Sequence, residues 1–376
     1  MKQFDYIIAG AGAAGLTLAW LLTGFEDKEK TVLIVDKDSK STNDRTWCFW
    51  EKGENLLEEL VFKTWAKATV KTSDWEEQYT LAPYQYKMIR AIDFYEFMKQ
   101  ALQLPQVTWV EEEIVSISHD GIVKTNATEY QGSYVFDSTL DLNALRNSKS
   151  TTILQHFSGQ VIHTPKRLFD SETATYMDFS IDQEGDCRFG YVLPFDSQTA
   201  LVEYTLFNDQ LLTEEAYAER LRNYIQHLGI ESYEVKEEEY GIIPMTDFPF
   251  KTKVSNKVFN IGIKGGFAKA STGYSFLRSQ KAMQKMAENI QSGLPPNHKL
   301  PYQSPRFRKY DATLLTVLNG GKYTGEDIFG KLFQKNGLHI MFRFLDEETS
   351  LQEELSIMSS TPILDFGKAF LQKLIS

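Results

Sequence analysis

The first 36 residues carry the clearest pattern of apolar and polar positions in the chain. An apolar run at 5–9 predicts a short buried strand, and the apolar residues of 16–23 predict a helix after it. A second apolar run at 31–36 predicts another strand, which ends in an acidic residue. This order of strand, turn, helix and strand is typical of the start of a nucleotide-binding parallel sheet.

The turn between the first strand and the helix has the glycine spacing of a dinucleotide site, with Gly10, Gly12 and Gly15. We expect Gly10 to permit the tight turn, Gly12 to let the backbone approach a pyrophosphate, and Gly15 to allow close helix–strand packing. Asp36 follows at the distance where an acid accepts hydrogen bonds from ribose hydroxyls. The combination favours a dinucleotide site over a glycine-rich surface turn.

The stretch after this unit decides between NAD and FAD. Residues 37–55 are polar and irregular, whereas a nicotinamide-binding domain would continue with further strand–helix units. Three consecutive short strands are predicted at 107–118, 121–126 and 129–136, as in the meander that interrupts the parallel sheet of two-domain FAD proteins. We expect the segment 134–137 to rejoin that sheet.

A second glycine-rich element lies far downstream. The apolar run 258–262 predicts a strand that leads through Gly262, Gly265 and Gly266 into a helix predicted at 272–291. In FAD folds such a late unit brings backbone amides to the flavin ring and its ribityl chain. The sequence therefore predicts FAD as the tightly bound cofactor.

Between the glycine-rich units the pattern becomes that of an antiparallel sheet followed by a helix from Thr213 to Gly229. The predicted strands are 157–163, 174–181, 188–195 and 199–207. Beyond a proline-containing linker near residue 296, periodic apolar positions predict helices at 306–318, 327–345 and 363–375.

The predicted fold is therefore α/β, with a Rossmann-like FAD-binding domain of the two-domain flavoprotein type. An antiparallel-sheet substrate domain is inserted into it, and a helical region follows. We expect the FAD-binding domain at 1–150 and 255–295, the substrate domain at 151–254 and the C-terminal helical region at 296–376.

Composition limits the function. The chain has 376 residues and a net charge of −11, which argues against nucleic-acid binding because a polyanion needs a clustered basic face. Cys48, Cys187 and the six histidines have no metal-ligand spacing, so we expect a reduced cytosolic protein without a structural metal. Aromatic residues reach 13%, which fits either an aromatic core or a large apolar ligand.

The C-terminal apolar residues admit two interpretations. Beside Lys331, Lys335 and Arg343 they could form an amphipathic surface that enters a membrane interface, or a packed helical pair. No apolar run approaches the roughly 20 residues that span a bilayer. The apolar set is Phe329, Leu332, Phe333, Leu338, Ile340, Met341, Phe342, Phe344 and Leu345.

Several short blocks occur in the order typical of one family: 43–50, 86–90 with Asp93, 155–159, 177–178, 193–194 and 272–275. The WCFW-type block and the TGYS block among them are not general features of FAD folds. In these blocks the chain resembles the bacterial branch of the lycopene β-cyclases.

The resemblance implies an activity that folds the acyclic ends of lycopene, a C40 polyene, into β-rings without net redox change. It implies reduced FAD, with NADPH or NADH as reductant, and lycopene or a related acyclic carotenoid as substrate. The implied chemistry is protonation of the terminal double bond, attack of a neighbouring double bond on the cation, and loss of a ring proton. Because lycopene is confined to lipid, we expect a cytoplasmic protein at the inner face of the membrane.

An alkene is a poor base, so this chemistry needs a carboxylic acid that burial keeps neutral. Glu203, in the run LVEYT, matches the family segment that holds the proposed acid. Glu239 ends an acidic run before Ile-Pro-Met and is a second candidate for proton handling, although three consecutive glutamates are commonly a solvated edge.

A carbocation also needs electron-rich walls, which aromatic rings supply. Arg45 and Arg90 match the charge of the FAD pyrophosphate or ribose, with surface ion pairs as the alternative. The candidate substrate-binding aromatics, each of which could equally be core, are Trp47, Phe49, Trp50, Tyr191 and Tyr204.

Two other functions fit the same scaffold. One is a flavin-dependent isoprenoid reductase or hydroxylase, and the other is a non-enzymatic prenyl-lipid carrier. The sequence leaves the oligomeric state open.

Overall fold

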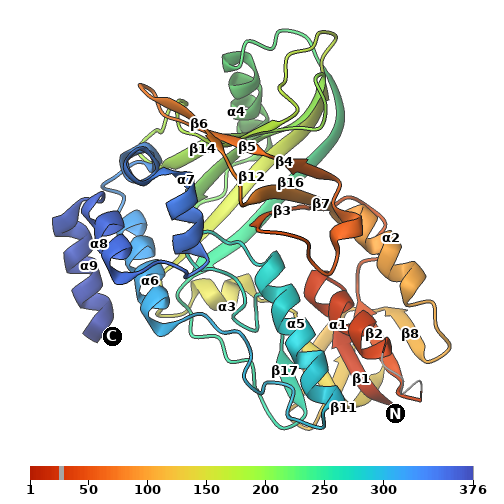
Figure 1. The fold of residues 1–376 in the computed structure, drawn as a ribbon. Helices are drawn as coiled ribbons and strands as arrows, with labels where there is room; N and C mark the ends of the chain where they lie inside the picture. Colours follow the sequence, from red (N-terminus) through yellow and green to blue (C-terminus); the bar gives the residue numbers. More distant parts are fainter. Residues whose placement is uncertain (25–28, 376) are drawn as a thin grey trace.

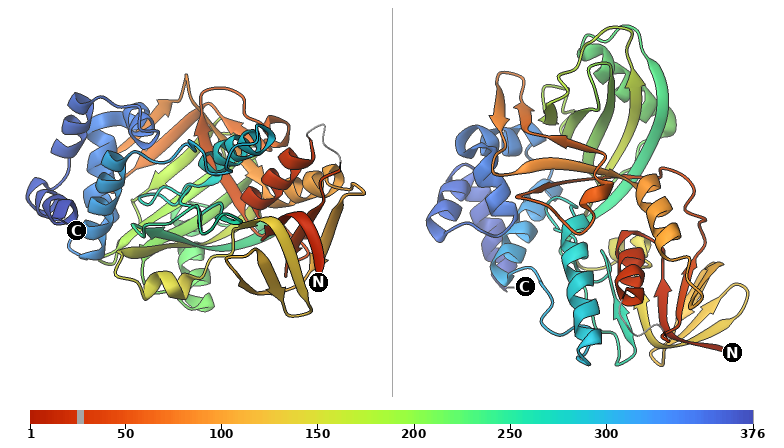
Figure 2. Two further views of the ribbon diagram at one scale, coloured as in Figure 1. Left: turned by 90° about the horizontal axis from the view of Figure 1, so that it is seen from below. Right: turned by 45° about the vertical axis from the view of Figure 1, so that its right-hand side comes forward.

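A computed structural model describes residues 1–24 and 29–375 of the chain (Figure 1). The N-terminal strands and the C-terminal helices lie on opposite sides of the molecule (Figures 1 and 2), and a long-stranded sheet rises above both in the view of Figure 1. No helix in the described ranges combines the length and apolar character needed to cross a bilayer.

The first sheet has the order β8-β2-β1-β11-β10-β9, and β17 also pairs with β11. Strands β8, β2, β1, β11 and β17 run parallel, whereas β9 and β10 form an antiparallel meander with β11. The strands are β1 (Lys2–Ala9), β2 (Val32–Asp36), β8 (Val107–Glu111), β9 (Ile114–Ile117), β10 (Ile122–Thr125), β11 (Glu129–Asp137) and β17 (Val258–Asn260).

The central strands of this sheet are apolar on both faces because both faces are covered. Ile8 and Ile34 pack beneath the helices, whereas Ile7 and Leu33 pack on the opposite face with the meander residue Val123. The helices are α1 (Ala13–Thr23), α2 (Ala91–Ala101) and α5 (Phe276–Gln291). This layering holds both glycine-rich turns at the carboxyl ends of parallel strands.

A three-stranded sheet, β3-β7-β4, joins the first sheet to the second. Its strands are β3 (Thr46–Glu51), β4 (Lys63–Trp65) and β7 (Gln85–Arg90), and the 3-10 turn η1 is Glu58–Leu60.

The second sheet has the order β16-β12-β15-β14-β13-β5-β6. Helix α4 (Glu214–His227) covers one of its faces, capped by the Thr213 hydroxyl on the Ala216 amide. The remaining elements of this part are β5 (Lys67–Lys71), β6 (Glu76–Thr80), α3 (Leu142–Arg146), β12 (Thr152–His163), β13 (Thr173–Asp178), β14 (Cys187–Pro194), β15 (Thr199–Asn208) and β16 (Glu234–Thr246).

Four helices and a π-helical turn follow, and they pack beside the second sheet at the end opposite to α1 (Figure 2). They are α6 (Pro305–Asn319), η2 (Glu326–Gly330), α7 (Lys331–Leu345), α8 (Leu351–Ser359) and α9 (Ile363–Ile375). Gly337 lies inside α7 with φ of 71°, which kinks that helix.

The predicted fold class is confirmed, but several elements differ from the sequence prediction. The run 107–118 is two strands, because β8 extends the parallel sheet beside β2 and only β9 begins the meander. The polar stretch 37–55 contains β3, which forms because β7 pairs with its whole length. The predicted helix 272–291 begins at Phe276, and 272–275 remain a turn in which Gly273 has φ of 72°.

Strands β5 and β6 and the charged strand β16 were not predicted. β16 is an edge strand with both faces of its first half exposed, so its side chains show no period of two. Because β5 and β6 belong to the second sheet, that sheet draws on chain outside 151–254. The domain boundaries themselves stay a prediction.

The packed-helix interpretation fits the C-terminal apolar residues of 329–345, most of which are buried, among them Phe333 and Phe342. Apolar side chains are instead exposed on α8 and α9. We call this set the leucine face: Leu351, Leu355, Ile363, Leu364, Leu371 and Leu374.

Candidate active site

The first glycine turn has the geometry of a pyrophosphate cradle. A Cβ on Gly15 would lie 2.1 Å from the Gly10 carbonyl oxygen, so the close helix–strand approach excludes any side chain there. A Cβ on Gly12 would have no described atom within 4 Å, which leaves open space at the N-terminus of α1. No side chain in the described ranges caps that terminus, so its amides can face an anion.

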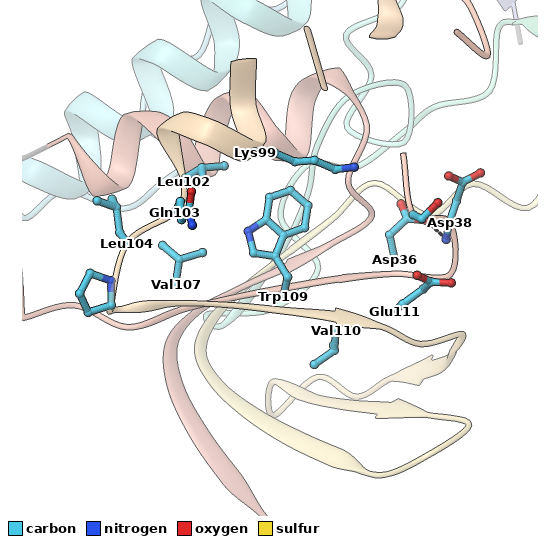
Figure 3. Close-up of a pocket in the computed structure, with 12 residues that line it drawn as sticks. Asp36, Asp38, Lys99, Leu102, Gln103, Leu104, Val107, Trp109, Val110 and Glu111 are labelled. Carbon is cyan, nitrogen blue, oxygen red and sulfur yellow. Dashed lines mark hydrogen bonds between the residues drawn. The ribbon is translucent and has the colours of Figure 1, made fainter. Parts of the chain in front are cut away.

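Asp36 ends β2 beside this turn and accepts a hydrogen bond from the Ala11 amide at 2.7 Å. It also lines an open cavity of about 700 Å³ between α2 and β8. Figure 3 shows the carboxylates of Asp36, Asp38 and Glu111 gathered at one end of this cavity and the Trp109 ring near its middle. The predicted ribose acid therefore borders space beside the glycine turn.

The second glycine unit packs against the first. A Cβ on Gly262 would lie 3.2 Å from the Ala14 Cβ, and Gly262 and Gly266 have φ of 58° and 84°. A Cβ on Gly265 would lie 2.7 Å from the Asn260 carbonyl oxygen. These residues fit a backbone held close to a flavin, as the sequence predicts.

A second cavity, of about 400 Å³, lies where the small sheet, the second sheet and the segment 263–276 meet. We call it the acid cavity. Its lining includes Arg45, Cys48, Gln155, Glu203 and Tyr274. It therefore lies between the FAD-type glycine units and the sheet that carries the candidate acids.

The register of the second sheet aligns the two candidate acids. Gly159 pairs with Glu203 on one side and with Glu239 on the other, and Tyr191 pairs with Glu203 on the next strand. A Cβ on Gly159 would lie 2.8 Å from the Glu203 Cγ and 3.1 Å from the Glu239 Cγ. Both glutamate side chains thus occupy the space that the glycine leaves free.

Glu239 is positioned from outside the sheet. The Thr46 hydroxyl of β3 donates a hydrogen bond of 2.7 Å to its Oε2. One oxygen of this carboxylate is therefore fixed by Thr46, and the side chain also interacts with the neighbouring carboxyl group of Glu203.

Glu203 has the environment that a neutral acid requires. Burial is the main cause that raises its pKa well above the ordinary value, and the charge of Glu239 raises it further. Burial together with these two glutamates also raises the pKa of the Cys48 thiol. Glu203 and Cys48 are therefore held neutral.

Three tyrosines, Tyr86, Tyr191 and Tyr274, line the acid cavity, and Tyr176 lies behind them. The hydroxyls of Tyr86 and Tyr274 lie 3.1 Å apart, and the Tyr176 ring meets those of Tyr86 and Tyr191 edge to face. Burial raises the pKa of each phenol, so all four remain neutral. They give the cavity electron-rich rings without introducing a charge.

The structure brings only some of the predicted aromatics to the acid cavity. Trp47 and Tyr191 line it. Phe49 and Trp50 line a smaller neighbouring space, and the Trp50 ring stacks on Phe342. Tyr204 does not reach the cavity, because strand alternation places it on the opposite face of the sheet with the residues beneath α4.

The two predicted arginines differ in position. Arg45 lines the acid cavity and makes an ion pair with Asp44 at 3.2 Å. Arg90 pairs with Asp93 at 2.7 Å, and its guanidinium lies 4.2 Å from the centre of the Phe62 ring. Of the two predicted arginines, Arg45 therefore lines the acid cavity and Arg90 does not.

The segment between the glycines and the acid cavity is fixed by a buried ion pair. The Lys269 ammonium lies 3.0 Å from the Asp311 carboxylate of α6, and both side chains are 2% exposed. This ion pair therefore links the segment between Gly266 and Thr272 to α6, the first of the C-terminal helices.

Sequence reasoning missed Thr46, Gln155, Gly159 and Tyr274 as individual site residues. A signal was present, because each lies in one of the family-like blocks, and those blocks converge on the acid cavity. His156, in the same block as Gly159, faces the other way and bonds to the Tyr217 hydroxyl; burial lowers its pKa to about 4.

Comparison with known proteins identifies relatives of this chain. The profile of a family described as lycopene cyclase protein matches residues 5–370. A lycopene beta-cyclase from Pseudescherichia vulneris is 24% identical over 389 residues, which cover 97% of this chain and 96% of that protein. Neoxanthin synthase from Solanum lycopersicum is 26% identical over 316 residues; the match covers 78% of this chain but only 61% of the plant protein.

Solved structures share the fold at low sequence identity. A geranylgeranyl bacteriochlorophyll reductase-like protein from Thermoplasma acidophilum has a TM-score of 0.65 at 12% identity, with 98% of each chain covered. A flavoprotein/dehydrogenase from Cytophaga hutchinsonii has a TM-score of 0.62 at 13% identity, with 99% of each covered. These likenesses establish a flavoprotein-type fold for this chain.

Proposed function

We propose, from the premise that the chain belongs to the lycopene cyclase protein family, that it is a lycopene β-cyclase. The observation that carries this proposal is the pair Glu203 and Glu239, whose side chains meet over Gly159, with Glu203 lining the acid cavity. The pair provides a neutral acid beside a second carboxyl group. Ring closure requires both, because a proton is added and another is removed.

In the proposed reaction the Glu203 carboxyl donates its proton to the terminal double bond of an acyclic end. A neighbouring double bond attacks the resulting cation, which forms the carbon–carbon bond of the ring. A ring proton then leaves to a carboxylate, a role that we assign to Glu239 because its side chain meets that of Glu203 over Gly159. One proton enters and one leaves, so the reaction involves no net redox change.

The cavity walls have two further roles. The rings of Trp47 and Tyr191 offer their π-electrons to the cation. The apolar lining from Phe157, Leu193 and Leu201 excludes water that would otherwise capture it.

The cofactor proposed for this site is FAD, held through the Gly12 turn, Asp36 and the segment from Gly262 to Gly266. Open space above Gly12 and the free amides of α1 fit a pyrophosphate. When bound and reduced by NADPH or NADH, FAD would supply an electron-rich ring system that can stabilise positive charge.

We also propose that the protein works at the cytoplasmic face of the membrane. The support is the leucine face, in which Leu364 is 80% exposed and Leu355 is 67% exposed. Large apolar side chains that two consecutive helices expose to solvent are a feature of interaction surfaces. The contact proposed here therefore involves α8 and α9 rather than the buried residues of α7.

The function is tested by the variant Glu203→Gln, which keeps size and hydrogen bonding but cannot donate an acidic proton. Purified protein with chemically reduced flavin is incubated with lycopene. The pigments are then separated, and their molecular masses are measured by mass spectrometry. Ring formation should fall by about 10²–10⁴-fold with flavin retained. Tyr204→Phe is the control, because Tyr204 lies on the opposite face of the sheet.

The masses of the products separate the competing functions. An unchanged mass with a β-ring supports the cyclase, whereas added hydrogen indicates a reductase and added oxygen a hydroxylase. Bound but unaltered lycopene in the wild type indicates a carrier. Near-normal ring formation in Glu203→Gln would show that the proton comes from elsewhere.

A further inference from the structure

A third cavity, of about 250 Å³, lies inside the C-terminal helical region. We call it the apolar chamber. Among the described residues that line it, the one carboxylate belongs to Asp311, which Lys269 neutralises. Its walls are otherwise hydrocarbon, aromatic rings and a few hydroxyls, with contributions from Leu314, Phe333, Met341, Ile357, Phe366 and Phe370.

The apolar chamber adjoins the acid cavity. Thr272 lines both spaces. Tyr176 lines the chamber, and its ring contacts those of Tyr86 and Tyr191, which line the acid cavity. The two spaces therefore meet at Thr272, and these tyrosines lie beside the junction.

The other end of the apolar chamber reaches the surface at the leucine face. Ile363 lines the chamber and is also 64% exposed. It lies at the start of α9, next to Leu364. A hydrocarbon that enters beside Ile363 would thus pass from an apolar surface into an apolar interior.

We propose that the apolar chamber binds the unreacted hydrocarbon chain of an acyclic isoprenoid whose end lies beside Glu203. The chamber offers the chain dispersion contacts and no unpaired charge, which matches a substrate without polar atoms. Ile363 marks the mouth through which the chain enters. This inference rests on the proposed function for the identity of the ligand, but it concerns separate residues.

The first test narrows the chamber. Leu314→Trp places a larger side chain in the wall of the chamber, at a residue far from Glu203 in the sequence. The control, Leu168→Trp, adds the same side chain at an exposed leucine between β12 and β13. Binding of lycopene to each FAD-loaded protein in detergent micelles is followed by the absorbance of the polyene. We expect at least about tenfold weaker binding for Leu314→Trp and wild-type binding for Leu168→Trp.

The second test blocks the mouth of the apolar chamber reversibly in the folded protein. A loss of binding that reverses can therefore be distinguished from misfolding. Ile363→Cys is modified with a bulky methanethiosulfonate reagent, and a thiol reductant then removes the group. Binding of lycopene should fall at least about tenfold after modification and return after reduction. The Leu168→Cys variant and the wild-type protein, treated with the same reagents, should bind lycopene unchanged.

The outcomes separate this inference from the proposed function. If both altered proteins bind lycopene as the wild type does, the chamber is not its site, whether or not ring formation occurs. If binding falls in both tests but wild-type protein with reduced flavin makes no ring, the chamber stands as an isoprenoid site and the cyclase assignment fails.

Discussion

Replacing Gly159 with alanine would place a methyl group between the two glutamates on which the proposed chemistry depends. The added Cβ would lie 2.8 Å from the Glu203 Cγ, 3.1 Å from the Glu239 Cγ and 3.3 Å from a Leu201 methyl. Because ordinary carbon contact begins near 3.4 Å, the Glu203 side chain must withdraw by about 0.6 Å and Glu239 by about 0.3 Å. The two carboxyl groups then move apart.

The change should affect activity more than stability. A misplacement on the order of 1 Å can cost about 10²-fold in rate, so we expect kcat/KM for ring formation to fall by roughly 10- to 100-fold. The glutamate side chains can rotate, so the cost of overpacking should stay near the lower end of about 1–3 kcal/mol. The alkaline limb of the pH profile should also shift to lower pH, because the charge of Glu239 would raise the pKa of Glu203 less.

The assay measures β-ring products from lycopene with chemically reduced flavin, together with the flavin spectrum and the melting temperature. Gly24→Ala is the matched control, because its Cβ would meet its nearest neighbour at 3.5 Å. Wild-type turnover with an unshifted pH profile in Gly159→Ala would refute the idea that the two carboxyls must meet over this residue.

Three further predictions concern the cofactor, the acid and the buried ion pair. Gly12→Val should abolish the flavin spectrum, because its side chain fills the open space above α1; retained FAD would contradict the pyrophosphate assignment. Burial raises the pKa of Glu203 in the folded protein. The stability that this carboxyl group contributes is therefore complete below its unfolded pKa and is lost as pH rises through its folded pKa. Glu203→Gln should therefore gain stability relative to wild type as pH rises above about 4, the unfolded pKa of a glutamate, measured by thermal unfolding; equal pH dependence would contradict a raised pKa. Lys269→Met should cost about 3–5 kcal/mol in urea unfolding because it leaves Asp311 buried without its cation, whereas Lys285→Met, at an exposed pair with Glu288, should stay within about 0.5 kcal/mol.

The elements that could be predicted are those whose signal is local. The turn at Gly10 to Gly15, the strand before it and the helix after it follow from residue spacing, because each glycine has a steric role within a few residues. The strands 174–181 and 188–195 and the helix from Thr213 were also found by their own periodicity. Strand β16 was not found, because its pairing with β12, and not its own side chains, makes it a strand.

The candidate site shows the same division. Family-like blocks marked stretches that line the acid cavity, and the alternation of β15 correctly placed Glu203 on one face with Leu201 and Phe207. The pattern could not show that Tyr204 faces α4 while Tyr191 faces the cavity. Which face of a strand meets a cavity depends on what packs against the sheet.

The sequence by itself determined the parallel sheet with its glycine turns and the presence of an antiparallel sheet, because spacing and alternation are complete within short segments. Glu203 became a candidate acid only through the resemblance of its segment to that of the lycopene β-cyclases, since its own pattern fits a solvated strand residue as well. Only the tertiary structure decided that Glu239 lies beside Glu203, that Gly159 makes room for both, and that a chamber lies under the leucine face. Each of these depends on residues far apart in the chain that meet only because three sheets and four C-terminal helices pack together.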